Sequence, residues 1–98
     1  MTEPALSLVI PAYNSAGYVS ANVLRVRDFY AQAGIDGEII VVDDGSTDGT
    51  ADSIVQTDRI RVVRVPHGGK GAALRAGMAT TTGAICGFTD ADLPYGTD

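Results

Sequence analysis

Short apolar runs alternate along this chain with segments whose apolar residues recur every three or four positions. The runs at 6–10, 38–42, 60–65 and 84–88 predict buried strands. Between them, the spacing from Val19 to Ala33 predicts a helix that stops at Gly34, and 70–79 predicts a second helix. A short helix through Ile54 and Val55 completes the series. The pattern predicts an α/β fold, an open and mainly parallel Rossmann-like sheet with helices on both faces.

Four positions refine this picture. Pro11 follows the first apolar run and is expected to end that strand. Arg61 and Arg64 interrupt the third run, which suggests a half-exposed strand at the edge of the sheet. Gly77 lies in a helix rich in small residues, where it costs roughly 1 kcal/mol of helix propensity but permits close packing on the sheet.

Polar clusters follow three of the predicted strands. They are Tyr13-Asn14, Asp43-Asp44 and Asp90-Ala91-Asp92. Because the carboxyl ends of parallel strands share one edge, we expect these clusters to converge in the crevice where such sheets bind ligands.

Asp90 and Asp92 are spaced i and i+2, which places them on the same side of an extended backbone. Paired carboxylates repel each other unless a positive charge lies between them, and a hard divalent cation that bridges phosphate oxygens is a common solution. The alternative is an ordinary turn after a strand, because Asp is frequent in turns.

The segment Gly68-Gly69-Lys70-Gly71 suggests a phosphate loop but fits neither standard motif. No Gly lies five positions before Gly69 and no Ser or Thr follows Lys70, so it is not a Walker motif. A dinucleotide fingerprint would follow the first strand and would need Gly where Leu74 stands. Two readings stay open: a helix start that needs permissive backbone angles, or a helix N-terminus and Lys70 that approach a phosphate.

Two further alternatives stay open on spacing alone. Asp44 either stabilises a turn, as expected for Asp43 and Asp48, or accepts hydrogen bonds from the ring nitrogens of a base. Tyr13 is either a core aromatic or lies against a nucleobase.

Composition limits the partners. The 98 residues make one domain at most, and 45% hydrophobic with 19% charged residues describes a globular chain. A net charge of −5 argues against nucleic-acid binding and against a polybasic membrane anchor.

A single Cys, an N-terminus without signal-peptide character and no apolar run near ~20 residues lead us to expect a cytoplasmic protein. His67 is the only histidine, so a histidine metal site or a Ser-His-Asp triad has little support.

Four segments in order carry a family resemblance. They are Val-Ile-Pro-Ala-Tyr-Asn at 9–14, Ile-Val-Val-Asp-Asp-Gly-Ser-Thr-Asp-Gly-Thr at 40–50, Gly-Lys-Gly-Ala-Ala at 69–73 and Thr-Asp-Ala-Asp-Leu at 89–93. Together they resemble the family 2 glycosyltransferases, which have the GT-A fold, and especially the enzymes that charge a polyprenyl or dolichyl phosphate with mannose or glucose. The motifs are specific to the family and much less specific to the sugar.

The resemblance implies a hexosyltransferase that uses a UDP- or GDP-hexose donor with Mg2+ or Mn2+. Each matching residue then has an implied role. Pro11, Ala12 and Tyr13 would line the nucleobase pocket, Asp44 would bond the base, and Lys70 and Gly71 would lie near the nucleotide. Asp90 would contact the ribose and the metal shell, and Asp92 would ligate the metal at the diphosphate.

Two departures from the family pattern qualify this assignment. Ser15 stands where the family usually carries an acidic residue, which removes a ribose or base contact and leaves UDP against GDP unsettled. The chain stops six residues after Asp92, before the segments that hold the acceptor in relatives. We therefore expect residues 1–98 to form a single nucleotide-diphospho-sugar-binding domain, the donor half of a truncated catalytic domain, whose full-length parent transfers sugar to a polyprenyl phosphate and associates with a membrane.

Two other functions remain as alternatives: a module that binds nucleotide-sugar without transfer, or a structural fragment without a ligand. Because the predicted sheet lacks its usual neighbours on one side, we also expect a homodimer through an exposed sheet edge.

Overall fold

The computed structural model describes residues 4–81 and the strand at 85–88. The elements follow in the order β1 (Leu6–Ala12), α1 (Val19–Ala33), β2 (Gly37–Asp44), the 3-10 helix η1 (Ala51–Ser53), β3 (Ile60–Val65), α2 (Lys70–Met78) and β4 (Ile85–Phe88). The strands form one sheet in the order β3-β2-β1-β4, and all described pairs are parallel. The predicted fold class is confirmed.

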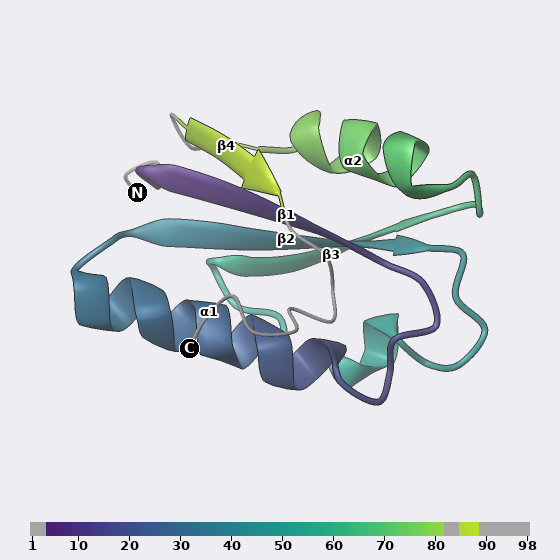
Figure 1. The fold of residues 1–98 in the computed structure, drawn as a ribbon, viewed down its shortest axis with the longest axis horizontal. Coiled ribbons are helices and arrows are strands. Elements are labelled where there is room, and N and C mark those ends of the chain that lie inside the picture. Colours follow the sequence, from purple (N-terminus) through teal and green to yellow (C-terminus); the bar gives the residue numbers. More distant parts are fainter. Residues whose placement is uncertain (1–3, 82–84, 89–98) are drawn as a thin grey trace.

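The two long helices cover opposite faces of this sheet (Figure 1). On the α1 face, Val19, Val23, Val26 and Tyr30 pack on Ile10 and on alternate residues of β2. On the α2 face, Ala73 packs with Val9, Ile40 and Val42. The side chains of β2 alternate between the two cores, which is why this strand is buried over its whole length.

The boundaries of α1 agree with the sequence pattern. Gly34 ends the helix with a left-handed φ of 71°, and the N–H of Ile35 returns to the carbonyl of Tyr30 at 2.8 Å. Ala33, predicted on the buried face, is exposed in the last turn, where the chain leaves the helix to enter β2.

Two predicted boundaries were wrong. β1 continues through Pro11 to Ala12, because β4 pairs with Leu6–Val9, and Pro11 lies beyond these pairs with β2 as its only neighbour among the described strands. The helix predicted through Ile54 and Val55 is a single 3-10 turn that ends before them, and Val55 is exposed.

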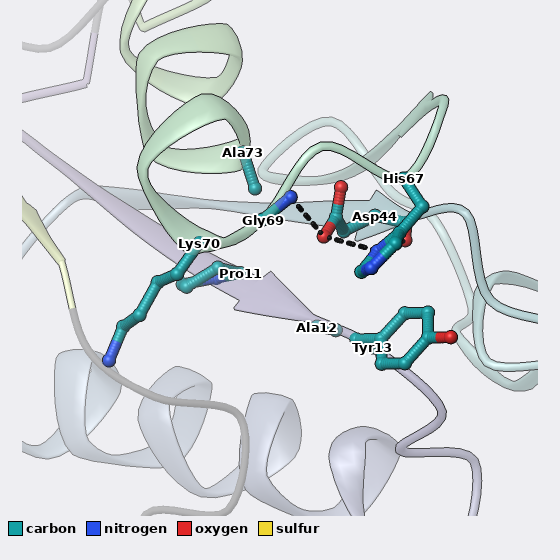
Figure 2. A pocket seen from close by; sticks show the side chains of 8 residues that line it. All are labelled: Pro11, Ala12, Tyr13, Asp44, His67, Gly69, Lys70 and Ala73. Atoms are coloured by element: carbon teal, nitrogen blue, oxygen red, sulfur yellow. Dashed lines mark hydrogen bonds and ion pairs between the residues drawn. The ribbon is translucent and has the colours of Figure 1, made fainter.

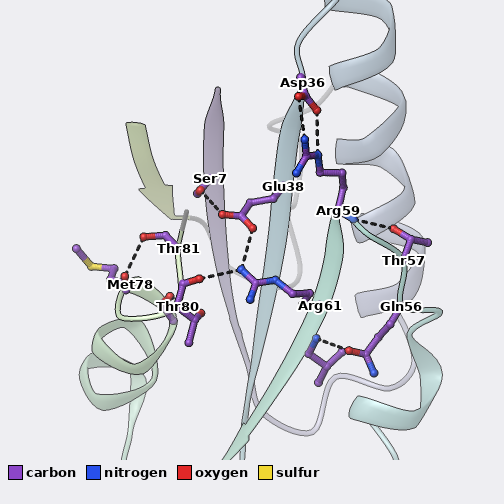
Figure 3. Close-up of polar contacts among 12 residues, drawn as sticks. Ser7, Asp36, Glu38, Gln56, Thr57, Arg59, Arg61, Met78, Thr80 and Thr81 are labelled. Atoms are coloured by element: carbon purple, nitrogen blue, oxygen red, sulfur yellow. Dashed lines mark hydrogen bonds and ion pairs between the residues drawn. The ribbon is translucent and has the colours of Figure 1, made fainter. Parts of the chain in front are cut away.

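β3 lies at the edge of the described sheet, as predicted. Its two arginines make different contacts. Arg61 and Arg64 are three residues apart and therefore lie on opposite faces of the strand. Arg64 pairs with Asp52 in solvent. On the α2 face, Arg61 reaches across to Glu38 of β2 (Figure 3), whose carboxylate is buried and also accepts a hydrogen bond from Ser7. The same guanidinium donates to the carbonyl of Thr80, just past α2.

α2 packs unusually close to the sheet at Gly77. A Cβ added there would lie 2.4 Å from Val9 Cγ1 and 2.8 Å from Val42 Cγ2. We expect Gly77→Ala to lower the free energy of unfolding by about 1 kcal/mol, because overpacking of about 1–3 kcal/mol outweighs the gain in helix propensity of roughly 1 kcal/mol.

Gly71 offers the matched control in the same helix. A Cβ on Gly71 would meet only Arg75 Nη1, at 3.6 Å. Gly71→Ala should therefore stabilise the chain by about 0.5–1 kcal/mol in urea unfolding. Equal effects of the two substitutions would show that the close packing of Gly77 on the sheet does not make Gly77→Ala destabilising.

Candidate functional site

A pocket of about 270 Å3 lies at the carboxyl ends of β1 and β2, beside the loop that joins β3 to α2. Three predicted segments meet there, because parallel strands deliver their following loops to one edge. The lining residues are Pro11, Ala12, Tyr13, Asp44, His67, Gly69, Lys70 and Ala73 (Figure 2). Five of the eight predicted site residues are thus brought together.

Asp44, the last residue of β2, is 4% exposed and anchors the β3–α2 loop. Its Oδ1 accepts the N–H of Gly68 at 2.8 Å, and its Oδ2 accepts the N–H of Gly69 at 3.1 Å. Oδ2 also lies 3.0 Å from Nδ1 of His67. Burial opposes the charge, but these hydrogen bonds and the nearby imidazole outweigh it and lower the pKa of Asp44. The pocket therefore contains an ionised carboxylate at neutral pH.

Tyr13 forms an aromatic wall of the pocket. Its side chain is 48% exposed, so the core-aromatic alternative was wrong. The ring stacks on the imidazole of His67 with centroids 4.4 Å apart and an interplanar angle of 26°. A flat, partly exposed aromatic surface beside a charged acceptor suits a planar ligand that carries N–H donors.

The other side of the pocket is the N-terminus of α2. Gly69 precedes the helix with φ of 94°, a conformation that glycine adopts readily, and this backbone turn aims its N–H at Asp44. Lys70 is the first residue of the helix and extends past Pro11, away from Tyr13 and His67 (Figure 2). Gly71 lies in the same helical turn but does not line the pocket. A helix N-terminus and an ammonium group on one side favour an anion there.

The loops that follow β1 and β2 are joined by hydrogen bonds. The N–H of Asn14 donates to Ser46 Oγ at 2.8 Å, and Asn14 Oδ1 accepts the N–H of Thr47 at 2.9 Å. Asn14 has a left-handed φ of 50°, which asparagine tolerates better than most residues. This exchange fixes the chain that leaves β1 relative to the chain that leaves β2, and so fixes Tyr13 beside Asp44.

Asp43 and Asp48 stabilise these loops, as expected. Asp43 Oδ1 accepts the N–H of Ser46 at 3.0 Å. Asp48 accepts from Ala16 N–H and from the backbone and hydroxyl of Thr50, and the Thr50 hydroxyl is the main cause of the lowered pKa of Asp48. Thr50 directly precedes η1, and its side chain makes no capping hydrogen bond to that turn.

Ser15 uses its hydroxyl in a local hydrogen bond. The residue is buried, its Oγ donates to the carbonyl of Tyr13 at 3.1 Å, and its N–H donates to Thr50 Oγ1 at 2.8 Å. Its side chain is therefore used within the loop, and Ser15 is not among the residues that line the pocket.

The predicted metal ligands Asp90 and Asp92 lie outside the described residues. Phe88, the last described residue of β4, pairs with Val9 of β1, two positions before Pro11. Within residues 4–81 and 85–88, no group of three or more His, Cys, Asp or Glu side chains could hold a metal ion. In the same part of the chain, no helix is both long enough and apolar enough to cross a membrane.

Three lining residues were not among the predicted site residues: His67, Gly69 and Ala73. Gly69 and Ala73 lie within the 69–73 segment, whereas His67 lies outside every segment that was singled out. It is a single histidine in a Pro-His-Gly-Gly loop, and no periodicity or motif spacing distinguishes it. One signal was available: the loop directly follows a parallel strand, as the three polar clusters do, and so ends at the same edge of the sheet.

A parallel sheet with a ligand-sized pocket at the carboxyl ends of its strands is the arrangement of nucleotide-binding α/β domains. The model of the family described as Glycosyl transferase family 2 matches residues 7–97. The chain belongs to this family.

Relatives and solved structures agree with this membership. An uncharacterised glycosyltransferase of Nostoc sp. is 40% identical over 92 residues, covering 89% of this chain and 28% of its own. The dolichyl-phosphate beta-glucosyltransferase of Saccharomyces cerevisiae is 33% identical over 101 residues, covering 92% and 30%. The chain therefore spans less than a third of the length of either relative.

Structures with bound ligands are among those similar to this chain. The mannosyltransferase PcManGT of Pyrobaculum calidifontis, in complex with GDP-Man and Mn2+, has a TM-score of 0.73 and 29% identity over 94% of this chain and 28% of that chain. Glucosyl-3-phosphoglycerate synthase of Mycobacterium tuberculosis, in complex with Mn2+, UDP and glucosyl-3-phosphoglycerate, has a TM-score of 0.67 and 32% identity over 90% and 33%. Each match covers at least 90% of this chain but at most 33% of the enzyme, so the chain is similar to one part of each enzyme. By family, the chain is a glycosyltransferase sequence.

Proposed function

We propose that this chain is the donor-binding half of a hexosyltransferase and holds a UDP- or GDP-hexose in the pocket formed by Tyr13, Asp44 and Lys70. One observation carries the proposal. A single pocket has an aromatic wall and an ionised carboxylate on one side, and a helix N-terminus with an ammonium group on the other. This polarity matches a ligand that is planar at one end and anionic at the other.

The base end of the ligand fits the side of Tyr13. Pro11 and Ala12 provide backbone and small side chains that allow a flat ring to approach β1, while Tyr13 provides a stacking surface. Asp44 supplies an acceptor for a ring N–H. The ligands of the two similar structures, GDP-Man and UDP, both carry bases with such a donor.

The diphosphate end fits the side of α2. Lys70 and the first N–H groups of the helix supply positive potential, with Gly71 in the same turn. In this proposal Asp92 and Asp90 hold Mg2+ or Mn2+. The two similar structures described above both contain Mn2+. A bound divalent ion would stabilise the negative charge that develops on the departing nucleoside diphosphate.

A polyprenyl phosphate is the proposed acceptor of the full-length parent. A phosphate acceptor is already ionised, so transfer to it needs no general base from the protein. The yeast relative named for dolichyl phosphate supports this acceptor class. We place the donor site in the cytoplasm, with the parent attached to the membrane that carries the lipid.

A thermal shift experiment tests the proposal. UDP-glucose or GDP-mannose with Mn2+ should raise the melting temperature of the chain, since a ligand at 100 times its Kd adds about 2.7 kcal/mol to the free energy of unfolding. Asp92→Ala should abolish the metal-dependent part of the shift. If no nucleotide-sugar shifts the melting temperature, the chain has no donor site and the structural-fragment alternative stands.

Turnover separates transfer from binding alone. Because the chain spans less than a third of the relatives, we expect it to bind donor without transferring sugar. Transfer of labelled hexose to a polyprenyl phosphate by the 98-residue chain would show that it also contains an acceptor site.

We also propose that the chain pairs with a second copy along β4. The outer edge of β3 is blocked, because the N–H of Val62 already donates to Gln56 Oε1 at 3.0 Å, and charged arginines occur along this strand. β4 has β1 as its only neighbour among the described strands. Light scattering after size exclusion should give twice the chain mass of 10.1 kDa. A monomer at high concentration would contradict this.

A further inference from the structure

The imidazole of His67 makes two distinct contacts at the base end of the pocket. Its ring stacks on Tyr13 with centroids 4.4 Å apart. Its Nδ1 lies 3.0 Å from Asp44 Oδ2 and 3.2 Å from the Asp44 carbonyl oxygen. Both of these atoms are acceptors, because the Asp44 carboxylate is ionised, so Nδ1 carries the proton and donates it.

A nucleobase bound as proposed above would make the same two contacts. It would lie against the Tyr13 ring, and it would donate a ring N–H, N3–H of uracil or N1–H of guanine, to the Asp44 carboxylate. Imidazole is also a flat heteroaromatic ring with an N–H donor. Two rings cannot stack on the same face of Tyr13 and donate to the same oxygen at once.

We propose that His67 is an internal competitor for the nucleobase: its imidazole occupies the base contacts in the free chain, and a bound base displaces it. This inference rests on the proposed donor site, and it adds a residue that sets how tightly that site holds the base. The diphosphate end of the site is unaffected, since Lys70 lies on the far side of Pro11 (Figure 2).

The structure lets the ring leave while the loop stays. The His67 side chain is 57% exposed, against 5% for Asp44, so rotation about its own side-chain bonds carries the imidazole into solvent. The backbone around it is held. Gly68 and Gly69 donate to Asp44, and Gly45 approaches so closely that an added Cβ would lie 2.7 Å from the backbone nitrogen of His67.

Displacement favours bases with a ring N–H. When the imidazole leaves, Asp44 loses one charge-assisted hydrogen bond, and uracil or guanine restores it. Adenine and cytosine present an unprotonated ring nitrogen at the corresponding edge and do not restore it through a ring donor. The same exchange therefore predicts that this pocket binds a UDP or GDP donor more tightly than an ADP or CDP donor.

Proton NMR of the wild-type chain tests the inference directly, because His67 is its only histidine. The ring C–H signals of His67 are recorded at one pH with Mg2+, and UDP, GDP or inorganic pyrophosphate is added. We expect UDP and GDP to shift these signals as the ring leaves the ring current of Tyr13, and pyrophosphate to leave them in place. Binding of UDP with unmoved histidine signals overturns the inference.

Variants give a second, independent readout by calorimetry. His67→Ala should tighten UDP binding at least tenfold, because the base no longer has to displace one ring contact and one hydrogen bond to a charged group, and it should leave pyrophosphate binding unchanged. His67→Phe keeps a ring on Tyr13 but cannot donate to Asp44, so its gain should be smaller. Weaker UDP binding by His67→Ala, or an equal gain for both variants, overturns the inference. If wild type and variants all fail to bind UDP and GDP, the proposed function itself falls.

Discussion

Replacing Arg61 by alanine is expected to lower the free energy of unfolding by about 2–3 kcal/mol. The Glu38 side chain is 3% exposed and its Oε1 lies 2.8 Å from Arg61 Nη2. Without the guanidinium, a buried carboxylate loses the charge that offsets its desolvation, which costs about 3–5 kcal/mol for a fully buried pair. Arg61 is 38% exposed, so water recovers part of this loss.

Arg64 is the matched control for this measurement. It lies on the same strand and pairs with Asp52 at 2.6 Å, but the two side chains are 66% and 77% exposed. Arg64→Ala should change the free energy of unfolding by less than about 0.5 kcal/mol, as surface pairs usually do. Comparable losses for the two variants in urea unfolding would refute a special role for the Arg61–Glu38 pair.

Asp44→Asn is expected to weaken UDP binding at least tenfold and to lower the free energy of unfolding by about 2 kcal/mol. An asparagine keeps one acceptor oxygen, but its NH2 group would face donors, because both carboxylate oxygens of Asp44 accept hydrogen bonds. One hydrogen bond to a charged group is worth about 1.5–3 kcal/mol, which sets both magnitudes.

The neighbouring Asp43→Asn controls for the change of charge. Only Oδ1 of Asp43 accepts a hydrogen bond in the described part of the chain, from Ser46, and an asparagine Oδ1 can replace it. We expect a loss below about 1 kcal/mol and unchanged UDP affinity. Calorimetry and urea unfolding on both variants decide the matter, and equal losses of affinity would remove Asp44 from the base site.

The stabilising contribution of Asp44 should also depend on pH. Its pKa in the folded chain is below the ordinary value of 3.8, so the folded state favours the ionised form. The contribution is therefore complete above the unfolded pKa and disappears as the pH falls through the lower folded pKa. The difference in stability between wild type and Asp44→Asn should be constant above about pH 5 and shrink below pH 4.

The fold was predictable because its signals are local and periodic. Val19, Val23, Val26 and Tyr30 mark one helical face, and four short apolar runs mark four strands. Convergence of Tyr13, Asp44 and Lys70 followed from the parallel arrangement alone. These conclusions need only the order of elements, not the contacts of individual side chains.

The contacts that were missed depend on register and on single residues. Arg61 meets Glu38 because β2 and β3 pair with Ile40 opposite Arg61, and no feature of either strand specifies that offset. His67 meets Tyr13 because the loop after β3 bends back over Asp44 through backbone hydrogen bonds. Side-chain chemistry at a loop is set by such bends, and residue spacing does not reveal them.

The pairing of β1 with β4 has a consequence for synthesis on the ribosome. β1 and β2 can pair early, but the other side of β1 waits for Ile85–Phe88, which follows α1, β2, β3 and α2 in the sequence. Until that strand emerges, the nascent chain exposes unsatisfied backbone groups along Leu6–Val9. Long-range parallel pairing of this kind forms slowly, so we expect chaperones to bind the nascent chain at β1 and to leave it when β4 docks.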